Sequence, residues 1–144
     1  NQRHKDIEAF EHDINSNYLA YIFNRSGFQA LNIKNNRFDF FTDNHMFVCD
    51  IDNEQENLIF SASRGRDTQE WEKLFQFINR ENLLPAPFPN ILFHLKEYDD
   101  YEILDLHAST ALTYKKGIIA SHIIAQATGF VGAMEYIDTK LKSL

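Results

Sequence analysis

Apolar residues near the start of the chain follow a helical spacing. They recur at steps of three and four between about Lys5 and Phe23, which predicts one helix with a single apolar stripe. The stripe consists of Ile7, Phe10, Ile14, Tyr18 and Tyr21. Gly27 follows, and it predicts the end of this helix because glycine adopts the left-handed C-cap conformation without steric cost.

The next part of the chain has the pattern of short strands. Aromatic and branched residues alternate with polar turns, which predicts an antiparallel meander. The expected strands are Phe28–Ile33, Arg37–Thr42, Met46–Ile51 and Leu58–Ser63. Asn35 and Asn36 tolerate a positive φ, so we expect a tight hairpin between the first two strands.

A second helix is predicted from Asp67 to Asn79. Asp67 and Glu70 resemble a capping box, and apolar residues then recur with helical spacing. These residues are Trp71, Leu74, Phe75 and Ile78. Three prolines then break the chain before an expected hairpin of Ile91–Lys96 and Tyr101–Leu106.

The last predicted helix runs from about Thr113 to Leu141 and carries two stripes. Large apolar residues follow one face: Ile119, Ile123, Ala127, Phe130, Met134, Ile137 and Leu141. Small residues recur every four positions on another face: Gly117, Ser121, Ala125, Gly129 and Ala133. We therefore expect this helix to pack on two sides. The complete order α-β-β-β-β-α-β-β-α predicts an α+β fold, an antiparallel meander sheet with helices at the start, middle and end.

Two of the predicted strands are apolar on both faces. The segments Phe38-Asp39-Phe40-Phe41 and Met46-Phe47-Val48-Cys49 lack the clean alternation expected of a sheet with one wet face. The second apolar face of such strands must also be covered, by the domain's own helices, by a twin subunit or by a bound chain. This pattern favours a binding function.

Length and charge narrow the classes of partner. The 144 residues fit a single domain, 1–144, that is large enough to bury a core. A net charge of −7 repels nucleic acids and anionic lipid surfaces, so a protein partner is favoured. Polar residues and glycines dilute the uncharged stretch from Gly117 to Met134, so we expect no membrane insertion. The single Cys49 excludes an internal disulfide and suits the cytoplasm.

Three sets of residues are candidates for chemical sites. His4, Glu8 and His12 share one face of the expected first helix, but structural zinc normally takes four ligands. Asp105, His107 and Ser109 lie near a strand end without a nucleophile-elbow motif, and Ser109 or Thr110 is expected in the turn before the last helix. The third set, Arg64-Gly65-Arg66, precedes a helix N-terminus, which favours anions, but phosphate loops usually carry several glycines. We therefore assign no catalytic residue and no metal ligand, and expect no cofactor.

The order of elements resembles the class I chaperones of type III secretion systems. Three stretches carry the resemblance, Phe38–Gly65, Asp67–Asn79 and Tyr114–Leu141. The resemblance implies a small, acidic, cytoplasmic homodimer that binds the N-terminal, non-globular region of secreted effector proteins. It implies a dimer interface at Trp71, Leu74, Phe75 and Ile78.

The same resemblance implies that apolar side chains of an extended effector segment enter surface pockets, partly through strand addition. The effector-binding residues would then be Phe10, Ile14, Phe28, Leu31, Phe38 and Phe40. Two other functions stay open: an acidic immunity or anti-defence protein that inhibits a toxin or nuclease, and an enzyme or ligand sensor that uses Arg64, Arg66 or His107.

Overall fold

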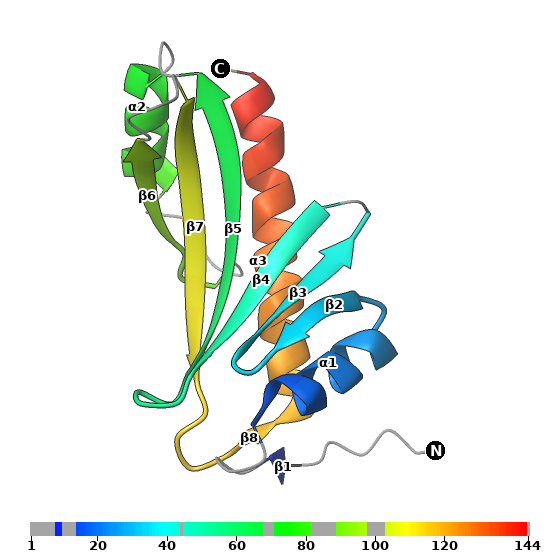
Figure 1. Ribbon diagram of the computed structural model, residues 1–144. Helices are drawn as coiled ribbons and strands as arrows, with labels where there is room; N and C mark the ends of the chain where they lie inside the picture. The colour runs from blue at the N-terminus through cyan, green and yellow to red at the C-terminus, as the bar shows by residue number, and fades with distance from the viewer. Residues whose placement is uncertain are drawn as a thin grey trace. The chain divides into compact units, whose positions relative to one another are not determined.

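The computed structural model describes residues 8–9, 14–43, 45–67, 71–81, 89–97 and 103–143. It confirms the predicted fold class, because it is an α+β fold with an antiparallel six-stranded sheet in the order β2-β3-β4-β5-β7-β6 (Figure 1). The strands of this sheet are β2 Gln29–Lys34, β3 Arg37–Thr42, β4 His45–Asp52, β5 Asn57–Asp67, β6 Leu92–Glu97 and β7 Ile103–Thr113. The helices are α1 Ser16–Arg25, α2 Trp71–Glu81 and α3 Ala120–Lys142.

Two compact units divide the chain. One comprises residues 1–60 and 111–128, and the other comprises residues 61–110 and 129–144. β5, β7 and α3 each contribute residues to both units. The single domain 1–144 expected from the length stays a prediction.

The first helix begins later than the apolar spacing predicts. Asn15 is the N-cap, and its side chain accepts a hydrogen bond of 2.9 Å from the Tyr18 backbone N–H. This cap fixes the start of α1 at Ser16, so the predicted start near Lys5 is wrong. Upstream, β1 (Glu8–Ala9) pairs antiparallel with β8 (Ile118–Ile119).

The buried face of α1 also differs from the predicted stripe. Tyr21 is 58% exposed, whereas the residues that face the core are Ser16, Leu19, Ala20 and Phe23. Ile7 and Phe10 lie outside the described residues. At the other end, Gly27 has a φ of 98° and the Phe28 N–H donates to the Phe23 carbonyl, so the predicted glycine stop is confirmed.

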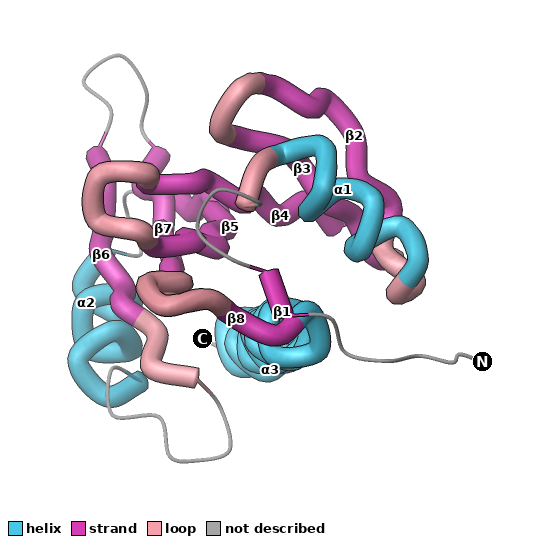
Figure 2. Tube along the Cα trace, turned by 90° about the horizontal axis from the view of Figure 1, so that it is seen from below, coloured by secondary structure: helices cyan, strands magenta, loops and turns pink. Residues whose placement is uncertain are grey.

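Phe23 is the centre of the aromatic core of the first unit. Its ring lies 4.9 Å from that of Phe40 and 5.2 Å from that of Phe38, both edge-on. Phe28 and Phe60 also contact the Phe23 ring. These contacts hold α1 against one face of β2 and β3 (Figure 2). Edge-on ring pairs stabilise the core beyond the contribution of the area that they bury.

The predicted hairpin at Asn35 and Asn36 is present, but the positive φ lies elsewhere. Asn32 has a φ of 54°, at a register shift between Leu31 and Lys34 in the β2–β3 ladder. The shift is a β-bulge, which bends the strand and increases its twist. The asparagine that enters the left-handed region therefore serves the bulge and not the turn.

β7 is longer than expected, and the last helix is shorter. β7 continues to Thr113, so Ser109 and Thr110 are strand residues and not part of a turn before the helix. The chain then turns through Lys116 and Gly117, whose φ values are 71° and 92°, and α3 begins at Ala120. The predicted start near Thr113 is wrong because this turn and β8 intervene.

The two stripes predicted on the last helix are present only in part, because Gly117 and Ile119 precede the helix start at Ala120. The large apolar residues Ile123, Ala127, Phe130, Met134, Ile137 and Leu141 are buried. Within the second unit, a Cβ atom at Gly129 would lie 3.3 Å from Pro89 Cδ. The small stripe therefore gives close approach at Gly129, while Ser121 and Ala125 are exposed.

Candidate protein-binding face

One face of the β2–β4 strands points away from α1. Phe38 and Phe40 face the aromatic core, so Asp39 and Phe41 lie on the opposite side, because successive side chains of a strand alternate. The register extends this opposite side to the neighbouring strands. We call it the outer face; it consists of Leu31, Arg37, Asp39, Phe41, Met46, Val48 and Asp50, of which Val48 is buried.

Apolar side chains are accessible on the outer face. Met46 is 50% exposed and Leu31 is 41% exposed, and Phe41, the cross-strand partner of Met46, is half-buried. Isolated exposed apolar residues are common on proteins, but these three come from three adjacent strands of one sheet. They provide separate anchor points for an apolar partner.

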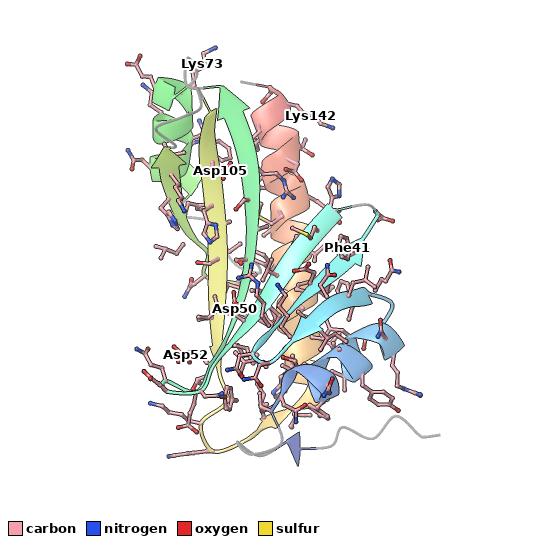
Figure 3. The ribbon with its side chains drawn as sticks, viewed as in Figure 1. Phe41, Asp50, Asp52, Lys73, Asp105 and Lys142 are labelled. Carbon is pink, nitrogen blue, oxygen red and sulfur yellow. The ribbon has the colours of Figure 1, made fainter. Side chains whose placement is uncertain are left out.

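Polar contacts border these apolar residues. Arg37 Nη1 lies 3.6 Å from Asp50 Oδ1 across the β3–β4 pair, and Asn32 Nδ2 donates to Asp39 Oδ2 at 2.8 Å. Figure 3 shows Phe41 and Asp50 toward opposite ends of this strand pair. The outer face thus combines an apolar end with a charged end.

β2 lies at one end of the strand order, but its backbone is poorly suited to receive another strand. The Ala30 N–H is already donated to Asn24 Oδ1 at 2.9 Å, and the bulge at Asn32 interrupts the regular ladder. Bulges and occupied backbone groups protect sheet edges from pairing. A partner therefore finds side-chain anchors on the outer face more readily than a free edge along β2.

The predicted effector-binding residues fall into different environments. Phe38 and Phe40 are fully buried, Ile14 is 5% exposed, and Phe28 packs on the Phe23 and Phe40 rings. Phe10 lies outside the described residues. Among the described members of the set, Leu31 is exposed and Phe28 is half-buried.

The predicted dimer-interface residues lie on α2. The helix is present, but the side chains of Trp71, Leu74, Phe75 and Ile78 lie outside the described part of the structure. Their role at a subunit contact stays a prediction. Phe77, which we did not single out from the sequence, is 1% exposed and is the buried residue that the structure describes on this helix.

The expected anion-binding turn at Arg64-Gly65-Arg66 is wrong, because these residues belong to strand β5 (Asn57–Asp67), and Arg64 forms an ion pair within the chain. Arg64 Nε donates to Asp138 Oδ1 at 2.7 Å, and Arg64 Nη2 donates to Asp138 Oδ2 at 3.1 Å. This bidentate pair links β5 to α3 within the second unit, and both side chains are about one-fifth exposed, at 19% and 22%. The Arg64 guanidinium is therefore engaged by a carboxylate of the same chain.

The other chemical candidates that the structure describes lie on strands β7 and β1. His107 Nδ1 lies 3.1 Å from Ser63 Oγ on β5, and Ser109 follows two residues later on the same face of β7. Glu8 belongs to a strand, so the helical arrangement expected with His4 and His12 is absent at this residue; both histidines lie outside the described residues.

Cys49 is buried on the side of β4 that faces the core. Burial raises the pKa of its thiol strongly, and the neighbouring Asp50 carboxylate raises it further. Because the thiolate is the nucleophilic form, this cysteine is not activated for chemistry. The predicted role of a small buried apolar residue agrees with this position.

The described residues contain neither a metal-binding cluster nor a membrane-spanning helix. They contain no group of three or more His, Cys, Asp or Glu side chains arranged to hold a metal ion. Among the same residues, no helix has the length and apolar character needed to cross a membrane.

Comparisons with known proteins support the fold. No family model and no curated protein matches the sequence. The crystal structure of YbjN from E. coli, a protein proposed to regulate transcription, is similar with a TM-score of 0.60. The sequence identity is 17%, and the alignment covers 83% of this chain and 82% of YbjN. At this identity the similarity concerns the fold alone.

Proposed function

We propose that this chain binds a non-globular segment of another protein through the outer face. The observation that carries the proposal is that exposed Leu31 and Met46 and half-buried Phe41 lie on three adjacent strands. Burying a fully exposed side chain of this size contributes about 1.5–3 kcal/mol, so covering the exposed half of Leu31 or Met46 contributes about 1 kcal/mol each. Because ordering a flexible segment costs about 2–5 kcal/mol or more, the segment must also form contacts with the rest of the outer face.

In its specific form, the proposal is a homodimeric cytoplasmic chaperone for secreted effector proteins. The chain would bind the N-terminal region of an effector and keep that region competent for secretion, with α2 at the subunit contact. The element order supports this form, as does the net charge of −7, which disfavours nucleic acid as the partner. A regulatory role like that proposed for YbjN would then act through protein contacts and not through DNA.

Matched substitutions test the binding face. Leu31→Asp and Met46→Asp each place a charge on the outer face. Leu92→Asp is the control, because it places the same charge on β6, where Leu92 is 65% exposed. The partner is first captured from the native host and identified by mass spectrometry, and its N-terminal segment is then titrated against each purified variant.

We expect Leu31→Asp and Met46→Asp to weaken binding of that segment by at least about tenfold each. Leu92→Asp should bind like the wild type. Equal affinities for all four proteins, with unchanged circular dichroism, would contradict the assignment of the outer face.

The high negative charge favours a second candidate, an acidic inhibitor of a basic toxin or nuclease. Salt separates the two functions. Electrostatic capture slows steeply as the ionic strength rises, whereas apolar anchoring changes little. An association rate that falls more than about tenfold between 50 and 500 mM salt would favour the inhibitor.

A further inference from the structure

Two histidines form a cross-strand pair in the second unit. His94 on β6 lies directly opposite His107 on β7 in the antiparallel register. Their ring centroids are 4.7 Å apart, with an interplanar angle of 40°. His94 is exposed and His107 is half-buried, so solvent reaches the pair.

We propose that this pair binds a divalent transition-metal ion, with zinc as the representative ion. Imidazole nitrogen is a good ligand for Zn²⁺, Cu²⁺ and Ni²⁺. Two Zn–N bonds of about 2.0–2.1 Å in tetrahedral geometry hold the donor nitrogens about 3.4 Å apart. The separation of the two rings is compatible with such a bridge after small side-chain rotations.

Ser63 supplies the supporting contact that such a site requires. Its Oγ lies 3.1 Å from His107 Nδ1. Metal binding at His107 Nε2 would select the tautomer in which Nδ1–H donates to the serine oxygen. Histidines that bind metals generally donate their second N–H to an oxygen in this way, which fixes the ring and its tautomer.

The remaining neighbours limit the kind of site. Asp105 lies two residues before His107 on the same face of β7, and Figure 3 labels it on that strand. Its cross-strand partner is Lys96, which opposes its negative charge. With two protein ligands, water molecules complete the coordination, so the ion exchanges readily and is not a structural zinc, which normally takes four protein ligands.

Zinc titration of the full chain without an affinity tag tests the site. Isothermal calorimetry with ZnCl₂ should give one equivalent of bound metal in the wild type. His94→Gln and His107→Gln should each reduce the affinity by at least about tenfold, and Ser63→Ala by a smaller factor. His122→Gln, which changes an exposed histidine on α3, is the matched control and should leave the affinity unchanged.

The increase of Tm on zinc addition is a second measurement. It should disappear in His94→Gln, whose exposed side chain is replaced without loss of the fold. The absence of zinc binding by the wild type would overturn the proposal. Binding that both His94→Gln and His107→Gln retain would also overturn it, because the metal would then lie elsewhere on the chain.

Discussion

Single residues account for much of the local structure of the first unit. The Asn15 side chain caps α1, the Asn24 side chain accepts the Ala30 N–H, and Asn32 occupies the bulge. Asparagine is common at caps and in left-handed conformations, so the sequence indicates that such features exist. It does not indicate which asparagine takes which role, because that choice depends on the neighbouring strand.

The Cys49 thiol predicts how stability depends on pH. Its pKa is raised in the folded state, so the folded thiol keeps its proton at a pH where the unfolded thiol loses it. Stability is then fully present below the unfolded pKa of about 8.5 and falls above it. For this one group, the free energy of unfolding should fall by about 1.4 kcal/mol per pH unit.

Urea unfolding of the wild type and Cys49→Ala between about pH 7 and pH 10 measures this effect. The difference in unfolding free energy between the two proteins should shrink by roughly 1 kcal/mol or more over this range. A difference that stays constant would show that the folded thiol ionises as readily as the unfolded one.

At the scale of elements, strands were easier to predict than helix ends. β3 has the predicted bounds Arg37–Thr42, because alternation and flanking turns agree there. The spacing of Ile7, Phe10 and Ile14 suggested a helix, but the Asn15 cap places its start at Ser16. Helical spacing alone does not locate a cap, and the pairing of β1 with β8 involves residues far apart in sequence.

Two glycines of α3 should respond differently to alanine. A Cβ atom at Gly132 meets nothing within 4 Å, whereas one at Gly129 would approach Pro89 Cδ at 3.3 Å. Gly132→Ala should therefore stabilise the protein by about 0.5–1 kcal/mol, the gain in helix propensity. Gly129→Ala should gain less, or lose stability, because Pro89 must move. Thermal and urea unfolding measure both, and equal gains would refute the close approach at Gly129.

The Arg64–Asp138 pair should matter more than the exposed Arg37–Asp50 pair. Asp138→Ala leaves a partly buried guanidinium without its bidentate carboxylate, which we expect to cost about 1–3 kcal/mol. Asp50→Ala removes a pair whose side chains are 53% and 38% exposed, and it should cost less than about 1 kcal/mol. Comparable losses in urea unfolding would argue against a structural role for Arg64.

At the scale of the whole molecule, the two-sided apolar strands were the informative signal. The sequence indicated that β3 and β4 need a covering on both faces, and the structure places Phe38, Phe40 and Phe47 on the core side. It leaves Phe41 and Met46 on the other side. Which apolar residues belong to the core and which to the outer face was not predictable, because the assignment depends on where α1 packs.

Mapping the partner's binding site through the backbone amide signals of the protein tests the central claim most directly. Nuclear magnetic resonance spectra of the ¹⁵N-labelled chain are recorded with and without the partner's N-terminal segment. The proposal predicts that the largest shifts occur at Leu31, Phe41, Met46 and their neighbours on β2–β4. Shifts confined to β6, β7 or α2, with the outer face unchanged, would contradict it.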